Sequence, residues 1–149
     1  MAFGISWVLR QQLCLGPAPK QLEDLQKLQA EGICSVFSLC GDNDWQPLPQ
    51  LADWFEWRKF SLPDHRSGRA PEPEELTACI EILAELMAQA PVYVHCLAGM
   101  ERSPLLVLAW LMQRKKLRLQ QALDYLQQVH PGTNPLPEQL AVLKLLKHA

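Results

Sequence analysis

The chain has 149 residues, which is the size of one domain with a hydrophobic core of ordinary volume. Hydrophobic residues make up 48% of it and charged residues 20%, a balance typical of a folded globular protein. The formal net charge of -2 excludes a broad basic surface, so we expect neither nucleic acid nor an acidic membrane as its main partner. A single domain over residues 1–149 is the prediction.

Cysteine usage indicates a reducing compartment. The five cysteines are Cys14, Cys34, Cys40, Cys79 and Cys96. Their number is odd and no two form a CxxC pair, which favours free thiols over a disulfide framework or a zinc site. The N-terminal segment lacks a continuous apolar run with a cleavage site, and the longest apolar run, residues 104–112, is too short to span a bilayer. We therefore expect a cytoplasmic protein that holds no metal.

The first half of the chain alternates short apolar strands with helices. Leu22, Leu25 and Leu28 repeat at helical spacing, and Gly32 follows as a C-cap, so this segment is predicted to be an amphipathic helix. Apolar, β-branched runs between turn residues predict strands. The predicted strands cover residues 6–9, 13–15, 33–39 and 56–62, and the predicted helices cover residues 18–30 and 48–55.

The second half contains a proline-rich loop, one further strand and four helices. The loop covers residues 63–73, and glutamates follow it in the first turn of a long helix, where they suit the helix dipole. Residues 92–95 form the strand, and the helices cover residues 72–90, 104–115, 119–129 and 136–147. This order predicts an α/β fold: a mostly parallel central sheet flanked by helices on both faces, with ligands bound at the carboxyl ends of the strands.

The segment VYVHCLAGMERSP, residues 92–104, joins the last strand to a helix that is apolar nearly all round. Ser103 and Pro104 suit the N-cap and first position of that helix. A helix N-terminus presents unpaired N–H groups, and the preceding loop can turn its own amides inward to surround a tetrahedral oxyanion. The amides of this predicted phosphate-binding loop belong to Leu97, Ala98, Gly99, Met100, Glu101 and Arg102.

Two side chains of this loop suit chemistry on a bound phosphate. Arg102 can fork onto two oxygens of a phosphate group. The same positive surroundings favour the thiolate form of Cys96, which is the reactive form of a cysteine. The loop therefore predicts a nucleophile and a phosphate clamp at one site.

The sequence HCLAGMERS, residues 95–103, matches HCx5R[S/T], the signature of cysteine-dependent protein tyrosine and dual-specificity phosphatases. The segments SWVLRQQLCLGPAP, LPDHRSGRAPEPEEL and VHPGTNPLPEQ resemble the first strands, the general-acid loop and the C-terminal segment of small dual-specificity phosphatases. Together they cover most of the chain. Its length is similar to that of the compact, atypical dual-specificity branch and too short for a complete tyrosine-specific domain.

The resemblance implies a two-step mechanism without a cofactor. Cys96 would attack phosphorus and form a phosphocysteine, while Arg102 and the loop amides hold the equatorial oxygens. Asp64 would protonate the leaving oxygen and then act as the base for water. Ser103 would stabilise the thiolate as it leaves, and His95 would hold the loop through backbone hydrogen bonds.

Other residues near the predicted acid have simpler interpretations as well. Asp64 follows a proline and could be a turn residue, since aspartate favours turns. Asp42 and Asp44 are competing carboxylates, but they lie in an earlier loop, where we expect them to form a turn. Arg66 and Arg69 could steer an anionic substrate or could simply be solvated loop residues.

Three residues near the predicted site raise further questions about its chemistry. Glu101 stands where the family has a small residue; its side chain is expected to face outward, and its charge argues against polyphosphoinositide substrates. Gln139 either positions the hydrolytic water, as in tyrosine-specific relatives, or is an exposed helix residue. Cys40 either forms a reversible disulfide with Cys96, as in phosphatases of the regenerating-liver type, or is a small core residue.

The favoured function is a monomeric dual-specificity-type phosphatase that acts on a phosphorylated protein or peptide, with phosphotyrosine and also phosphoserine or phosphothreonine as substrates. A phosphatase for a small molecule or for an RNA 5′ phosphate is an alternative with the same chemistry. A non-catalytic phosphate-binding module would be expected to lack the acid or the nucleophile. A sulfurtransferase of the rhodanese type would not need Asp64 or the Arg-Ser pair at this spacing, and would form thiocyanate from thiosulfate.

Overall fold

The computed structural model describes residues 3–146, which fold around a five-stranded sheet with the strand order β1-β2-β5-β3-β4. β1 pairs antiparallel with β2, whereas β2, β5, β3 and β4 run parallel. The strands are β1 (Ser6–Leu9), β2 (Leu13–Gly16), β3 (Ser35–Ser38), β4 (Glu56–Lys59) and β5 (Val92–His95). The predicted mostly parallel central sheet is confirmed.

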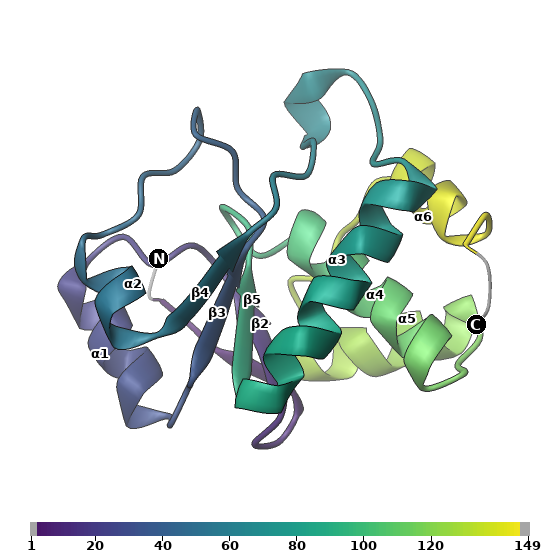
Figure 1. The fold of residues 1–149 in the computed structure, drawn as a ribbon. Coiled ribbons are helices and arrows are strands. Elements are labelled where there is room, and N and C mark those ends of the chain that lie inside the picture. The colour runs from purple at the N-terminus through teal and green to yellow at the C-terminus, as the bar shows by residue number, and fades with distance from the viewer. Residues whose placement is uncertain (1–2, 147–149) are drawn as a thin grey trace.

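Helices cover both faces of this sheet, as predicted (Figure 1). One face carries α1 (Leu22–Ala30) and α2 (Gln50–Trp54), and the other carries α3 (Pro73–Leu86), α4 (Arg102–Arg114), α5 (Leu119–Val129) and α6 (Pro137–Leu143). Short 3-10 turns are formed by η1 (His65–Ser67) and η2 (Met87–Gln89). None of the helices within residues 3–146 is both long and apolar enough to cross a membrane.

Two hydrophobic cores lie on opposite faces of the sheet because successive strand residues point to opposite sides. In β5, Val92 and Val94 join the core beneath α3 and α4, while Tyr93 joins the core beneath α1 and α2. β4 lies at the edge of the sheet, and unlike the central strands most of its residues are exposed. The central strands are thus buried on both faces, which explains their continuous apolar sequence.

Several predicted boundaries were wrong by a few residues. The first helix begins at Leu22 rather than at residue 18, because Ala18 precedes a proline and such residues avoid the helical region. The helix after the phosphate-binding loop begins at Arg102 with Glu101 as N-cap, so Ser103 and Pro104 lie inside its first turn. Proline is tolerated there because first-turn N–H groups lack helical partners. Lys147, the predicted end of the last helix, lies outside the described residues.

Candidate active site

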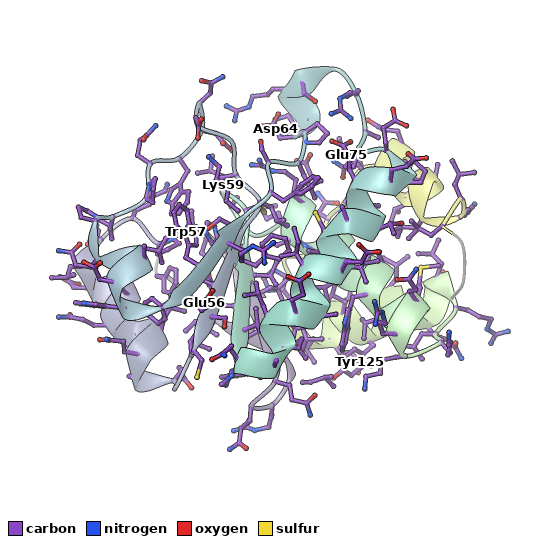
Figure 2. All side chains as sticks on the ribbon, viewed as in Figure 1. Glu56, Trp57, Lys59, Asp64, Glu75 and Tyr125 are labelled. Atoms are coloured by element: carbon purple, nitrogen blue, oxygen red, sulfur yellow. The ribbon has the colours of Figure 1, made fainter. Side chains whose placement is uncertain are left out.

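The predicted site residues meet at the carboxyl ends of β5 and β3. Cys96 follows β5 directly, and the segment after β3 contains Cys40 and Asp44. The segment after β4 rises above the strands before it turns down into α3, and Figure 2 shows Asp64 at the base of this loop. Cys96, Arg102 and Asp64 line one cavity of about 350 Å³, which is the size of a small ligand pocket.

The phosphate-binding loop, residues 96–102, needs a glycine at its centre. Gly99 has a φ of +75°, in the left-handed region that side chains rarely adopt. A Cβ there would lie 2.7 Å from the carbonyl carbon of Gly16. The loop therefore packs against the end of β2 too closely for any other residue.

Hydrogen bonds from outside the loop orient its peptide groups. The Leu97 carbonyl accepts from the Ala18 amide at 3.0 Å, and the Gly99 carbonyl accepts from His130 Nε2 at 2.5 Å. The Met100 carbonyl accepts from the Asn134 amide at 2.7 Å. In a trans peptide the next N–H points opposite to the carbonyl. The N–H groups of residues 98, 100 and 101 therefore point toward the inside of the loop, where a phosphate can bind them.

Cys96 lies at the bottom of this loop with 2% of its surface exposed. Its Sγ is 3.3 Å from the hydroxyl of Ser103, which is fully buried in the first turn of α4. At this distance the hydroxyl can donate to a thiolate, the role that the resemblance implies for it. The structure thus brings together the predicted nucleophile and the predicted stabiliser of its thiolate.

A hydrogen-bond chain fixes the ring of His95. Trp57 Nε1 donates to Ser38 Oγ at 2.8 Å, and Ser38 is 2.6 Å from His95 Nε2. His95 Nδ1 is 3.0 Å from the carbonyl of Cys96, which can only accept, so Nδ1 carries the proton and Nε2 accepts from the serine hydroxyl. Complete burial lowers the pKa of His95 to about 4, so the ring is neutral at neutral pH and suits a supporting role.

Arg102 is held by acceptors from two other segments. Its Nη1 lies 3.3 Å from the carbonyl of Leu39 and 3.4 Å from that of Leu62, and its Nη2 donates to Asp44 Oδ2 at 2.6 Å. Asp44 also accepts from the amide of Gly41, so it forms the expected turn. The sequence analysis did not predict that Asp44 pairs with Arg102. Asp44 follows the strand next to β5, and this position could have indicated that it lies near the site.

Asp64 is paired with its own loop. Its carboxylate accepts from the Arg66 amide at 3.0 Å and from Nε and Nη2 of the same residue at 3.0 and 2.8 Å. Partial burial raises the pKa of Asp64, but the hydrogen bonds and charge of Arg66 outweigh this and hold the pKa below its usual value. Arg69 is paired instead with Glu75, at 2.7 Å.

The side chain of Glu101 does not face outward as expected. Its Oε1 accepts from Gln139 Nε2 at 2.7 Å, and its Oε2 lies 2.9 Å from His65 Nδ1. The interpretation of Gln139 as an exposed helix residue was wrong, because only 1% of it is exposed. Both errors have one cause: α6 packs close enough to the phosphate-binding loop for the two side chains to meet.

Cys40 is fully buried at the end of β3, with its Sγ 4.0 Å from His95 Nδ1. Burial raises the pKa of the Cys40 thiol to about 12, partly offset by the charge of Arg102. Cys40 and Cys96 are both free thiols. A disulfide between them stays a prediction.

Comparison with known proteins identifies the family. Residues 13–148 match the family "Dual specificity phosphatase, catalytic domain". The dual specificity protein phosphatase PHS1 of Arabidopsis thaliana is 34% identical over 121 residues, which are 80% of this chain but 12% of that protein. The phosphatidylglycerophosphate phosphatase PTPMT2 of the same plant is 23% identical over 133 residues, which are 89% of this chain and 58% of that protein.

Solved structures agree with this result. Tk-PTP in its active form superposes with a TM-score of 0.82 at 25% identity, over 95% of each chain. PTPMT1 in complex with PI(5)P has a TM-score of 0.80 at 20% identity, over 95% of this chain and 92% of the other, and shares the fold. The chain therefore belongs to the dual specificity phosphatases of the cysteine-dependent protein tyrosine phosphatase superfamily, and it carries their catalytic domain.

Proposed function

We propose that the protein hydrolyses phosphomonoesters through a phosphocysteine intermediate. The observation that supports this most directly is one cavity lined by a thiol, a guanidinium and a carboxylate, those of Cys96, Arg102 and Asp64. A binding module would need the loop amides and the guanidinium only. The acid beside the nucleophile therefore favours turnover over binding alone.

In the first step the Cys96 thiolate attacks phosphorus and the bond to the leaving oxygen breaks. The loop N–H groups and Arg102 neutralise charge on the three equatorial oxygens, where it is concentrated in the transition state. Protonated Asp64 gives its proton to the leaving oxygen, which departs as an alcohol or phenol. General acid catalysis of this kind contributes about 100- to 10,000-fold in rate.

In the second step water replaces the leaving group. The Asp64 carboxylate takes a proton from the water as its oxygen attacks phosphorus, and the phosphorus–sulfur bond breaks. Cys96 leaves as a thiolate that accepts a hydrogen bond from the Ser103 hydroxyl, 3.3 Å away. Asp64 is then protonated, and release of inorganic phosphate frees the site for another substrate.

A phosphorylated protein or peptide is the proposed substrate, with phosphotyrosine as the first residue to test. The net charge of -2 gives no support to an RNA 5′ end. We also propose that the enzyme acts as a monomer in the cytoplasm, and the five free thiols favour such a reducing compartment.

A phospholipid headgroup is the second candidate substrate. PTPMT2 is named for phosphatidylglycerophosphate, and PTPMT1 was solved with PI(5)P. Met100, 41% exposed, lines the cavity together with Leu97 and Leu136, which gives the cavity an apolar side. The Glu101 carboxylate in the same cavity argues against headgroups that carry several phosphates.

The test is hydrolysis of an aryl phosphate under reducing conditions by wild type, Cys96→Ser and Asp64→Ala. We expect wild type to turn over, Cys96→Ser to be inactive, and Asp64→Ala to lose most activity toward poor leaving groups. Acid quenching of Asp64→Ala during turnover of an activated ester should yield phosphocysteine at Cys96. Phosphopeptide and phospholipid panels then separate the two substrate classes.

A wild type that binds vanadate but releases no phosphate from any of these esters would contradict the proposal and favour a phosphate-binding module. Thiocyanate formation from thiosulfate and cyanide would instead favour the sulfurtransferase.

A further inference from the structure

The carboxylate of Glu101 is bound at both of its oxygens by two segments that lie far apart in the sequence. Gln139 of α6 donates to Oε1 at 2.7 Å, and His65 of η1 lies 2.9 Å from Oε2. A carboxylate only accepts hydrogen bonds, so His65 Nδ1 carries the proton of this contact. Glu101 itself lies next to Arg102, at the end of the phosphate-binding loop.

The α6 side of this contact is rigid. Gln139 is 1% exposed, and its Oε1 accepts from the amide of Leu136 at 2.8 Å. A backbone N–H requires the amide oxygen and a carboxylate requires the amide nitrogen, so the orientation of the Gln139 side chain is chemically determined. Gln139 therefore holds Glu101 independently of His65.

Two contacts hold the acid loop, residues 63–70, near the phosphate-binding loop. Arg102 Nη1 lies 3.4 Å from the carbonyl of Leu62, just before the acid loop, and His65 contacts Glu101 from within it. His65 follows Asp64 directly, and its side chain is 58% exposed. Asp64 is paired with Arg66 of the same loop, which does not fix the loop relative to Cys96. Within residues 3–146, the bond from His65 to Glu101 is the hydrogen bond that joins residues 63–70 to residues 96–103.

We infer that Glu101, braced by Gln139, is a positioning residue that holds the acid loop over the nucleophile through His65. This inference rests on the proposed phosphatase function. It assigns the Glu101 side chain a role in placing the acid for proton transfer to the leaving group, while the Glu101 amide still binds the phosphate. It also gives Gln139 a task other than positioning the hydrolytic water.

The leaving group of the substrate distinguishes these roles. An activated ester such as 2,4-dinitrophenyl phosphate needs little protonation, whereas phenyl phosphate depends on the acid. We expect Glu101→Ala to lower kcat/KM for phenyl phosphate by about 10-fold more than for the activated ester, a part of the 100- to 10,000-fold that an acid supplies. His65→Ala removes the same contact from an exposed side chain, so it tests the inference even if Glu101→Ala does not fold.

A double-mutant cycle shows whether Glu101 acts through Asp64. If it does, adding Glu101→Ala to Asp64→Ala should change kcat/KM for phenyl phosphate by less than about 2-fold. The effects of substitutions in residues that act as one unit are not additive. The matched control is Glu81→Ala, which removes an exposed glutamate of α3 that does not line the cavity. It should behave like wild type with both esters.

Three results would overturn the inference. Equal losses with both esters, or full additivity with Asp64→Ala, would mean that Glu101 acts on the phosphate rather than on the acid. Phosphocysteine that accumulates in Gln139→Leu, without the leaving-group effect, would restore the water-positioning role. A wild type that is inert toward both esters is a separate outcome, in which the proposed function itself fails and the inference fails with it.

Discussion

The guanidinium of Arg102 and the carboxylate of Asp44 form a buried ion pair, with Nη2 donating to Oδ2 over 2.6 Å and side chains 5% and 10% exposed. Arg102 faces the phosphate pocket on one side and this aspartate on the other. Asp44 therefore both orients the guanidinium and balances its charge while the pocket is empty.

Removing Asp44 should destabilise the protein strongly. Asp44→Ala leaves the Arg102 charge buried without its partner, which typically costs about 3–5 kcal/mol in the free energy of unfolding. Urea denaturation measures this loss. Vanadate should stabilise Asp44→Ala more than wild type, because the anion then replaces the counter-charge that Asp44 supplies.

Asp42→Ala is the matched control for this prediction. Asp42 lies in the same segment, but its side chain is 87% exposed and pairs with Lys59 on the surface. Exposed pairs contribute about 1 kcal/mol at most. Equal effects of the two alanine variants would contradict the role of Asp44 as the partner of Arg102.

Arg66 should set the pH at which the acid stops working. Asp64 can act as an acid only while its carboxyl group is protonated. Turnover of phenyl phosphate therefore falls as pH rises through the pKa of Asp64. Arg66 holds the pKa of Asp64 low. Arg66→Gln should therefore move this fall to higher pH and raise turnover at neutral pH several-fold, as a pH–rate profile would measure.

The control is Arg69→Gln, which removes the partner of Glu75 instead and should leave the pH–rate profile unchanged. Identical profiles for the two variants would refute the prediction.

His95 should make stability depend on pH. Its pKa is lowered to about 4 by burial, whereas an unfolded histidine has a pKa near about 6.5. The unfolded state thus binds more protons between these values, so stability is complete above about pH 6.5 and declines as pH falls toward 4. The loss amounts to about 3 kcal/mol at about 1.4 kcal/mol per pH unit.

Urea denaturation at several pH values of wild type and His95→Asn isolates this contribution, since carboxyl titration is common to both. We expect a smaller decline in the variant. An equal slope in both proteins would mean that His95 binds protons in the fold as it does in the unfolded chain.

Mild peroxide should link Cys40 to Cys96. Peroxide oxidises the Cys96 thiolate to a sulfenic acid, and the Cys40 thiol then displaces water to form the disulfide. Non-reducing peptide mapping should find this bridge, and dithiothreitol should restore activity. Cys40→Ser should instead proceed to sulfinic acid and lose activity irreversibly, while Cys79→Ser behaves like wild type. Sulfinic acid at Cys96 of wild type, with Cys40 free, would contradict the prediction.

The sequence was sufficient to predict the sheet, the helices on both faces and the placement of Cys96. These depend on local patterns: continuous apolar strands, helical leucine spacing and a strand-loop-helix motif. Predicted helix boundaries were wrong where a proline disfavoured helix although the spacing of apolar residues favoured it, as at residues 18–22. The start of α4 at Arg102 was missed because Ser103 and Pro104 resemble a cap, while the loop before them is already curved.

The contacts that complete the site were harder to predict. Asp44 reaches Arg102 across 58 residues of sequence, and Gln139 reaches Glu101 across 38. No local pattern encodes such pairs, because they depend on how the connecting segments pack. The order of strands gave a partial signal for Asp44. The resemblance placed Gln139 near the hydrolytic water as one alternative, but it did not indicate the contact with Glu101.

The outward carbonyls of the phosphate-binding loop have a consequence for folding. Their donors come from Ala18 near the start of the chain and from His130 and Asn134 near its end. Such contacts of high sequence separation form late, when both ends of the chain have been brought together. The loop is therefore assembled only in the complete fold, and a partly folded chain lacks the phosphate-binding site around Cys96. Catalytic activity is for this reason expected to vanish together with the global structure, not before it.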